Sequence, residues 1–307
     1  MESDMSNSYI IGIDIGGTNF RIGAVDEQNQ VVHFRKIPTG EVFHTEDAMA
    51  DLTAYLTEYC RMLQDEGKWI QALSIGFPTT INRERTKVLQ APNIPFMENL
   101  PVVEVLGRKL GLPVFIERDV TMALLYDQVK YGLTDCEVLT GIYFGTGLGN
   151  ALMIGGKMLV GRNGTAGELG HIPVDGNELV CGCGNVGCME TVAAGRYLTY
   201  LCREVFTDTR VEDIFTKHGQ HELLLQFVDR MAMAVTTEIN ILNPDCVLIG
   251  GGVPQMKDFP KEYLAERIWE RTRKPYPSED LYLIFAEDAE NKSVIGAAVY
   301  ARQKYRQ

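Results

Sequence analysis

Long apolar segments are absent from this sequence. No part of the 307-residue chain approaches the roughly 18 consecutive apolar residues that a membrane-spanning helix needs. The first residues, MESDMSNS, are polar and acidic, and no basic segment leads into an apolar run as it does in a secretory signal. The seven cysteines are odd in number, and four stand alone in apolar surroundings: Cys60, Cys136, Cys202 and Cys246. We therefore expect a reduced, cytoplasmic protein without a membrane partner.

Positive charge is also scarce. The chain has 29 Lys and Arg residues against 41 Asp and Glu residues, which gives a net charge of -12. This balance argues against a nucleic-acid partner, because binding to a phosphate backbone needs clustered basic side chains. It leaves nucleotides open, since backbone N–H groups and a metal ion can hold their phosphates. With 45% hydrophobic and 23% charged residues, the chain is typical of a globular protein and long enough for two domains.

Two common nucleotide-binding signatures are missing. Neither the Walker A spacing nor the G-x-G-x-x-G turn occurs, which disfavours P-loop and Rossmann folds. Three other glycine turns each follow an apolar run that we predict to be a strand: Gly16-Gly17-Thr18, Gly145-Thr146-Gly147 and Gly250-Gly251-Gly252. Backbone N–H groups in such turns form a nest for anions, and threonine adds a hydroxyl donor. One such turn is more often structural, but a matched pair with a third favours phosphate binding.

The first two turns lie in a repeated strand–turn–strand pattern, which predicts two related α/β halves. The predicted strands are Tyr9–Ile15 and Asn19–Val25 in one half, and Val138–Phe144 and Asn150–Ile154 in the other. Further apolar patterns predict strands at Ala72–Phe77, Val114–Ile116, Cys246–Ile249 and Leu281–Phe285. Helical spacing predicts helices at Glu46–Gln64, Asp119–Val129, Glu190–Phe206, Leu223–Leu242 and Val294–Tyr305.

A glycine-rich segment from Gly167 to Glu190 contains the remaining cysteines. Cys181, Cys183 and Cys188 lie close together in it, and His171 precedes them. Three thiolates and one imidazole form a standard tetrahedral zinc set. The alternative, a group of free surface thiols, is improbable at this spacing.

The glycine turns and the cysteine segment together resemble a known family. Asp14-Ile15-Gly16-Gly17-Thr18, Tyr143–Gly147 and Leu248–Gly252 resemble the first phosphate, second phosphate and adenosine motifs of the sugar kinase/Hsp70/actin superfamily. The segment Gly167–Glu190 is similar to the zinc motif of one branch, the ROK sugar kinases. The resemblance implies an α/β, two-domain actin-like ATPase fold that uses ATP, Mg²⁺ and a structural Zn²⁺. It also implies a small domain of residues 1–118 plus 293–307 and a large domain of residues 119–292.

The resemblance assigns roles to individual residues. It implies that Asp119 is the catalytic base, although from the residues alone an aspartate at a helix start could simply be a cap. It implies that Asp14 helps to place Mg²⁺ and that the three glycine turns hold ATP. It implies zinc ligation by His171 and the three clustered cysteines. The positions implied to bind sugar are Pro78, Asn93, Arg118, Glu168, His171 and Glu190. The plain alternative is that Asn93 ends a turn and the glutamates are solvated.

Two departures from the common pattern lie among the residues expected to bind sugar. Glucokinases of this family carry Asn-Asp where this chain has Arg118-Asp119, and Thr79 replaces the glycine after Gly76-Phe77-Pro78. An arginine is longer than an asparagine, charged and only a donor, so it should favour a different arrangement of sugar hydroxyls. Arg-Asp-Val together with Pro92–Pro95 is similar to the D-allose kinase branch. The resemblance thus implies phosphorylation of a free hexose at the 6-hydroxyl, with D-allose favoured.

Other functions stay open at this point. Glucokinase, N-acetylmannosamine kinase and fructokinase share these motifs. A sugar-responsive transcriptional regulator of the ROK type is the alternative from another class. Such regulators carry a helix-turn-helix domain before the first phosphate motif, whereas only thirteen residues precede Asp14 here and the charge is unsuitable for DNA. A zinc-stabilised sugar-binding protein without catalysis is a third alternative. Family members are often dimers, so we expect a homodimer.

Overall fold

The computed structural model describes residues 7–91, 94 and 96–305, and within it the chain divides into two compact units. Unit 1 consists of Met1–Tyr131, Val160–Ala166 and Ala289–Gln307. Unit 2 consists of Gly132–Leu159 and Gly167–Asp288. Unit 1 continues past Arg118, the end expected for the small domain, because the helix that begins at Asp119 packs on the C-terminal helix of the chain.

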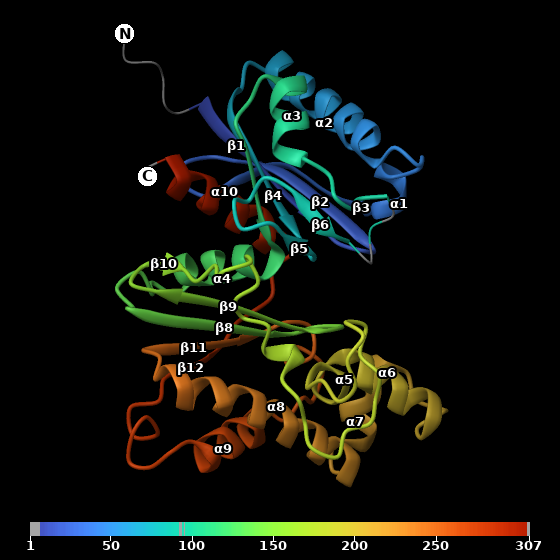
Figure 1. The fold of residues 1–307 in the computed structure, drawn as a ribbon, viewed down its shortest axis with the longest axis vertical. Helices are drawn as coiled ribbons and strands as arrows, with labels where there is room; N and C mark the ends of the chain where they lie inside the picture. Colours follow the sequence, from blue (N-terminus) through green and yellow to red (C-terminus); the bar gives the residue numbers. More distant parts are fainter. Residues whose placement is uncertain (1–6, 92–93, 95, 306–307) are drawn as a thin grey trace. The chain divides into compact units, whose positions relative to one another are not determined.

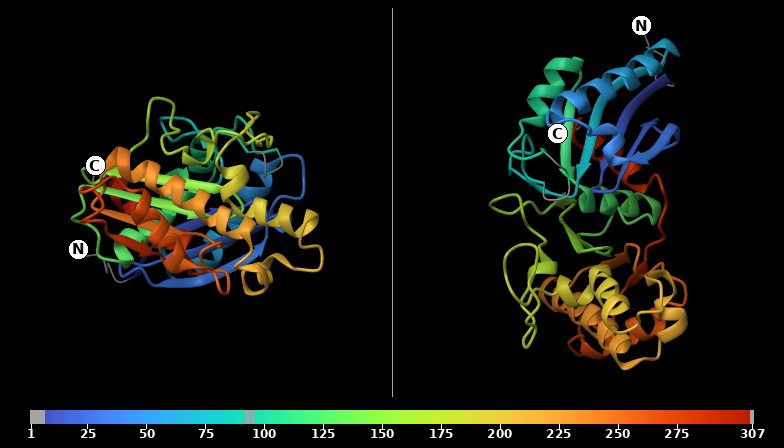
Figure 2. Two further views of the ribbon diagram at one scale, coloured as in Figure 1. Left: turned by 90° about the horizontal axis from the view of Figure 1, so that it is seen from below. Right: turned by 90° about the vertical axis from the view of Figure 1, so that its right-hand side faces the viewer.

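Unit 1 is built on a five-stranded sheet with helices on both faces (Figures 1 and 2). The strand order is β3 (Val31–Pro38), β2 (Asn19–Val25), β1 (Ser8–Ile15), β4 (Trp69–Phe77) and β7 (Val114–Arg118). Strands β3, β2 and β1 are antiparallel neighbours, whereas β4 and β7 run parallel to β1. The helices are α1 (Thr39–Val42), α2 (Ala48–Asp65), α3 (Val102–Leu110), α4 (Asp119–Lys130) and α10 (Lys292–Tyr305). A small hairpin is formed by β5 (Thr80–Ile81) and β6 (Val88–Gln90).

Alternation along β1 explains how the sheet of unit 1 is covered on both faces. Ile11, Ile13 and Ile15 are fully buried in the cluster that includes the apolar residues of α2 and α3. Gly12 faces the opposite side, where a Cβ atom would collide with the backbone carbonyl of Val294 in α10. The glycine therefore allows α10 to lie directly against the strand, and period-two alternation places the two helix layers on opposite faces.

Unit 2 repeats the same sheet plan. Its strand order is β10 (Lys157–Met158), β9 (Leu148–Ile154), β8 (Val138–Phe144), β11 (Cys246–Gly250) and β12 (Leu283–Phe285). Again the first three are antiparallel neighbours, and the last two run parallel to the central strand. Its helices are η2 (Leu169–His171), α5 (Glu190–Ala193), α6 (Gly195–Glu204), η3 (Val211–Asp213), α7 (Ile214–His218), α8 (Glu222–Leu242) and α9 (Lys261–Arg271). The predicted internal repeat thus corresponds to two sheets of equal order.

One predicted helix is wrong as a continuous element. The expected helix Glu190–Phe206 is two helices, because the chain takes an extended conformation at Ala194. The break lets the first N–H groups of α6 reach the second glycine turn: Gly195 donates to the Gly145 carbonyl at 2.8 Å and Arg196 to the Thr146 carbonyl at 3.1 Å. Such tertiary bonds satisfy donors that a helix start leaves unpaired.

The long helix α8 ends where the sequence predicts a stop. Asn243 adopts the left-handed conformation with φ 46, and its N–H donates to the Ile239 carbonyl at 2.9 Å. Pro244 follows and cannot continue the helix. Among the helices of the described residues, none has the length and apolar character needed to cross a membrane.

Candidate active site

In unit 1, parallel strands bring the predicted acidic residues to one edge of the sheet. The register pairs Asp14 of β1 with Gly76 of β4, and Gly76 with Glu117 of β7. Asp119 begins α4 directly after β7 ends at Arg118. A Cβ atom at Gly76 would lie 3.5 Å from the Asp119 Cα, which is an ordinary contact distance, so the start of α4 lies directly beside β4. The predicted base and the predicted magnesium carboxylate therefore share one sheet edge.

Burial raises the pKa values of both acidic residues at this edge, Asp14 and Asp119. Burial, with the negative charge of Asp14 as a second cause, raises the pKa of Asp119 to about 7. Burial also raises the pKa of Asp14, against the opposing effect of Arg21, whose Nη1 donates to Asp14 Oδ2 at 2.8 Å. A carboxylate that titrates near neutral pH is suited to accept a proton from a hydroxyl, because general bases work best with a pKa near the working pH.

The contacts of Asp119 bear on the alternative that this residue only caps the start of α4. The N-cap of α4 is Arg118, so Asp119 is the first helical residue. Its Oδ1 accepts from the N–H of Val120 at 2.8 Å, which satisfies one donor of the first turn. This bond helps to fix the orientation of the carboxyl group, and it is compatible with a second role for the same side chain.

The first glycine turn joins β1 to β2 and is fastened from α1. The Gly16 N–H donates to the Asn19 carbonyl at 2.9 Å, which closes the turn. The Thr39 hydroxyl donates to the Gly16 carbonyl at 2.6 Å, and the Thr39 N–H donates to the Thr18 carbonyl at 2.9 Å. Gly17 and Thr18 are exposed. The turn is thus held by its carbonyls, while its tip lies open in the way that a phosphate nest requires.

The second and third glycine turns meet within unit 2. The Gly145 N–H donates to the Gly147 carbonyl at 2.9 Å, and this closes the hairpin between β8 and β9. Gly251 follows β11 with φ +91, and a Cβ atom there would lie 2.7 Å from the Phe144 backbone nitrogen. The Val253 N–H donates to the Phe144 carbonyl at 2.9 Å. Glycine is therefore required at 251 both for the backbone angle and for the approach to β8.

Glu190 connects the second glycine turn to the cysteine segment. Its Oε2 accepts from the N–H of Leu148 at 3.0 Å, and its Oε1 lies 3.2 Å from Nη1 of Arg196. The Cys181 Sγ lies 3.8 Å from Oε1. A Cβ atom at Gly147 would collide with the carboxylate, so the glycine makes room for it. The structure therefore gives Glu190 a position between two predicted sites, and its role toward a sugar stays a prediction.

The four predicted metal ligands converge. The ligand atoms of His171, Cys181, Cys183 and Cys188 all lie within 4.8 Å of one another. Cys183 Sγ and Cys188 Sγ are 3.7 Å apart, and Cys181 Sγ is 3.6 Å from His171 Nδ1. Tetrahedral zinc with bonds of about 2.3 Å to sulfur would separate two thiolates by about 3.8 Å. The donor set and its spacing therefore fit a closed zinc site.

Backbone pairing holds the two arms of this cluster together. The Met189 N–H donates to the Ile172 carbonyl at 2.9 Å, next to the bridge between Pro173 and Cys188. His171 turns Nδ1 toward the cysteines, and its Nε2 lies 3.6 Å from Glu168 Oε2. Glu168 is exposed. The histidine thus links the metal cluster to the first predicted sugar carboxylate.

Two arginines, Arg85 and Arg118, donate to backbone carbonyls of the segment Val160–Ala166 in unit 1. Arg85 Nε donates to Glu117 Oε2 at 2.8 Å, and its Nη1 donates to the Gly164 carbonyl at 3.3 Å. Arg118 Nη2 donates to the Ala166 carbonyl at 2.7 Å. Glu117 is buried between them, with its Oε1 accepting from the Arg118 N–H at 2.9 Å. Sequence reasoning missed Arg85 and Glu117, because an ion pair between residues 32 positions apart leaves no local pattern.

The remaining predicted sugar contacts differ in how far the structure describes them. Pro78 is half-buried directly after the end of β4. Asn93 lies outside the described residues. Arg118 is buried, and its Nη2 donates to the Ala166 carbonyl of the same chain. A direct contact between Arg118 and a sugar stays a prediction.

Comparisons with known proteins agree with this arrangement. The chain is 27% identical over 321 residues to a glucokinase of Thermotoga maritima, with 98% of this chain and 99% of the relative covered. It is 28% identical over 297 residues to an N-acetylmannosamine kinase of Salmonella typhi, with coverage of 95% and 98%.

Solved structures match over nearly the whole chain. A ROK family glucokinase from Streptomyces griseus, in complex with glucose and AMPPNP, matches with a TM-score of 0.74 and 26% identity, covering 96% of this chain and 99% of that one. A ROK family transcriptional regulator, a homologue of the E. coli MLC protein, matches with a TM-score of 0.84 and 25% identity, covering 97% and 79%. The expected α/β, actin-like ATPase fold is confirmed. The model of the ROK family matches residues 10–304, and the chain belongs to that family.

Proposed function

We propose that this protein is an ATP-dependent hexokinase that transfers the γ-phosphate to the 6-hydroxyl of a free hexose, with D-allose preferred. Membership of the ROK family and likeness to glucokinases over almost the whole chain make it an ATP-dependent sugar kinase. The observation that carries the reaction is the carboxyl of Asp119, poised with a pKa of about 7 at the same sheet edge as Asp14.

In this proposal, Asp119 accepts the proton of the sugar hydroxyl as the oxygen attacks the γ-phosphorus in line. Burial that raises its pKa makes proton uptake favourable while leaving a large ionised fraction near pH 7. The bond from the Val120 N–H to Oδ1 holds the carboxyl orientation during the transfer. Because phosphoryl transfer needs positioning and charge stabilisation more than covalent help, the role proposed for Asp119 is to orient the hydroxyl and accept its proton.

ATP and Mg²⁺ fit the residues at the strand ends. The Gly16–Thr18 and Gly145–Gly147 turns would hold phosphates through backbone N–H groups, and Gly250–Gly252 would pack against adenosine. Asp14 would help to place Mg²⁺ through water, since its carboxylate is a hard oxygen acceptor and burial makes a positive partner favourable. When bound, Mg²⁺ neutralises the charge of the β- and γ-phosphates.

Zinc would be held by His171, Cys181, Cys183 and Cys188, whose spacing fits a closed tetrahedron. With four protein ligands no position is left open for catalysis, so the metal would be structural. It would order the glycine-rich segment and hold Glu168 and Glu190 at its two ends. Those two carboxylates, with His171, Asn93 and Pro78, are the residues that we propose to bind the sugar.

The D-allose preference is proposed from Arg118, which stands where glucokinases of the family have asparagine. Allose differs from glucose in the orientation of the 3-hydroxyl, so a changed neighbour of the base is a suitable place for discrimination. Initial rates with ATP would be measured for D-allose, D-glucose and N-acetylmannosamine in wild type and Arg118→Asn. We expect the highest kcat/KM with D-allose and a shift toward glucose in the variant. A wild-type preference for glucose would remove the allose proposal and leave the kinase intact.

A sugar-responsive regulator is the second candidate, favoured by the likeness to the ROK family transcriptional regulator. The two functions separate in one assay. A kinase consumes ATP in proportion to added hexose, whereas a regulator binds hexose without turnover. Absence of hexose-dependent ADP formation across the sugar panel, in a sample that binds hexose, would favour the regulator.

A further inference from the structure

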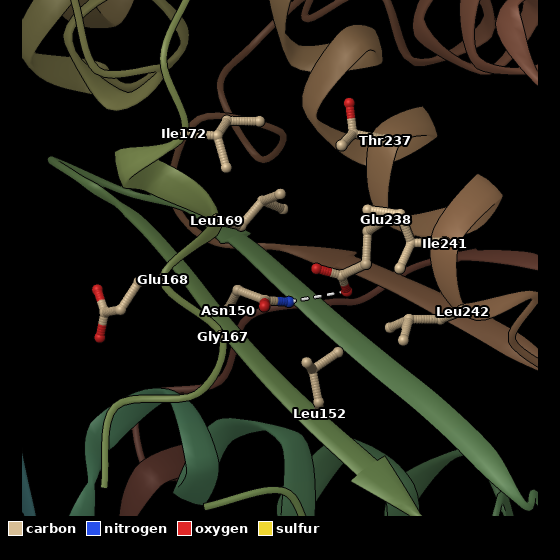
Figure 3. Close-up of a pocket in the computed structure, with 10 residues that line it drawn as sticks. All are labelled: Asn150, Leu152, Gly167, Glu168, Leu169, Ile172, Thr237, Glu238, Ile241 and Leu242. Carbon is tan, nitrogen blue, oxygen red and sulfur yellow. Dashed lines mark hydrogen bonds between the residues drawn. The ribbon is translucent and has the colours of Figure 1, made fainter. Parts of the chain in front are cut away.

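Unit 2 contains a cavity that none of the proposed ATP, zinc or catalytic groups occupies. It has a volume of about 290 Å³ and lies between β9, the segment Gly167–Ile172 and the C-terminal half of α8 (Figure 3). Its walls are mainly apolar side chains: Leu152, Leu169, Ile172, Ile241 and Leu242. Ile241 is 74% exposed, unusual for an isoleucine, and marks the side of the cavity that opens to solvent.

A buried carboxyl group lies among these apolar walls. Glu238 of α8 is only 5% exposed. Its Oε1 accepts two hydrogen bonds, from the Thr140 hydroxyl of β8 and from Asn150 Nδ2 of β9 at 2.9 Å. Among the described residues, Oε2 has no hydrogen-bond partner. Figure 3 shows this carboxyl group directed into the space between Asn150 and Leu169.

The bonding pattern identifies the protonated oxygen. Burial raises the pKa of Glu238 to about 8, with the Asn150 bond opposing the rise, so the group is neutral near pH 7. Because Oε1 already accepts from two donors, the proton lies on Oε2. Glu168 is the other titratable residue of the lining, and Figure 3 shows its carboxylate pointing away from Glu238. Glu238 therefore presents an O–H donor to the cavity.

We propose that this cavity is a binding site for a small neutral molecule, mostly apolar, that offers one hydrogen-bond acceptor to Glu238 Oε2. An apolar cavity of about 150 Å³ is enough for benzene, so the space here suits one ring with a polar substituent. An O–H donor that faces apolar walls gains from a partner, and an acceptor on the ligand would supply one. A positively charged ligand group would require Glu238 to lose its proton and the cation to lose its hydration, so a neutral acceptor should be preferred.

A molecule in the cavity would contact the segment Gly167–Ile172, which carries residues predicted to bind sugar. Leu169 forms part of the wall and belongs to η2, between Glu168 and His171. An occupant would pack against Leu169 and restrict the segment that carries a predicted sugar ligand and a predicted zinc ligand. We therefore expect occupancy to slow amide exchange in residues 167–172.

Cyclohexanone is the probe for this site, and cyclohexylammonium is its charged counterpart with the same ring. Binding to the whole protein would be followed at pH 7 by saturation-transfer NMR, which does not depend on kinase activity. We expect millimolar binding of the ketone, weaker binding of the ammonium ion, and slower hydrogen–deuterium exchange in residues 167–172 with the ketone. Binding of the ammonium ion in preference to the ketone would overturn the proposal, as would unchanged exchange in that segment.

Amino-acid substitutions would show whether the ketone binds in this cavity. Ile241→Asp places a charge at the cavity, and Val205→Asp is the matched control, since Val205 is 47% exposed and is not among the cavity residues. We expect Ile241→Asp to weaken ketone binding about tenfold, equivalent to ~1.4 kcal/mol, and Val205→Asp to leave it unchanged. Glu238→Gln keeps a donor in the place of Oε2 and should retain binding. Equal ketone binding by Ile241→Asp and Val205→Asp would show that the ketone binds elsewhere.

Discussion

The two sheets of this protein have the same strand order but carry different chemistry at the ends of their parallel strands. In unit 1 the strand ends present acidic and charged side chains: Asp14, Glu117, Arg118 and Asp119. In unit 2 the corresponding ends of β8 and β11 present glycine turns with backbone groups. Unit 1 also has the Gly16–Thr18 turn after β1, so in our proposal unit 1 contributes both a base and a phosphate turn, whereas unit 2 contributes glycine turns.

Each unit also has a buried carboxyl group on a helix, and the partners of the two groups differ. In unit 1, Asp127 of α4 is fully buried and accepts from Lys292 Nζ of α10 at 2.6 Å, which makes a buried ion pair. In unit 2, Glu238 has hydroxyl and amide partners instead, and burial raises its pKa to about 8. A cation thus neutralises the carboxylate of Asp127, whereas a proton neutralises that of Glu238.

Asp119→Asn should have the largest effect, because it removes the base from unit 1. We expect kcat to fall by ~10²–10⁴-fold, the usual contribution of general-base catalysis, while the dissociation constants for sugar and ATP stay close to wild type. Steady-state kinetics and calorimetric titration measure the two quantities separately. Asp135→Asn, at an exposed position, is the control. Equal losses of binding and turnover would mean that Asp119 acts mainly as a structural residue of the α4 start.

Lys292→Met should destabilise unit 1 strongly, because it leaves Asp127 buried without its cation. We expect a loss of ~3–5 kcal/mol in the free energy of unfolding, measured by denaturant titration. Breaking the exposed Arg108–Glu104 pair with Arg108→Met should cost only ~0–1 kcal/mol. Adding Asp127→Leu to Lys292→Met should restore much of the loss. Similar small effects for the buried and exposed pairs would contradict the buried-charge account.

Gly251→Ala should disturb the backbone site of unit 2. The residue has φ +91 and lies against the Phe144 backbone, so an alanine should destabilise the protein by at least ~1 kcal/mol and raise the KM for ATP. Gly252→Ala is the matched control for stability, since a Cβ atom there would meet nothing within 4 Å. Thermal unfolding would be compared for the pair, and ATP kinetics would be compared between Gly251→Ala and wild type. Indistinguishable behaviour of the two variants would argue against a tight junction between β8 and the third turn.

Lowering the pH by one unit should have the smallest effect of the four changes on activity. The raised pKa of Asp119, about 7, means that the ionised base is lost as the pH falls through that value. We expect kcat/KM to be constant above about pH 8 and to decrease at most ~tenfold per pH unit below about pH 6. A profile that stays flat from pH 8 to pH 5 would show that the free enzyme does not depend on this ionisation.

The sequence predicted the elements that depend on local patterns. Strands Asn19–Val25 and Val138–Phe144 have their predicted bounds, and the stop of α8 at Asn243 follows from a left-handed residue before proline. The metal cluster was also foreseeable, since its cysteines are close in sequence and their ligand atoms do converge. The break at Ala194 was not, because the bond from Gly195 to Gly145 that accompanies it spans 50 positions.

The sequence by itself determined the family, the kinase motifs and the paired sheets, since glycine spacing and apolar alternation act over a few residues. Only the tertiary structure decided the contacts of the charged side chains. It placed Arg118 on the Ala166 carbonyl, joined Arg85 to Glu117, and set Glu190 between the second glycine turn and Cys181. It also buried Glu238 beside a cavity. Burial and partner choice depend on residues that are distant in the chain, and these fix both the pKa of a carboxyl group and the ligand that it can meet.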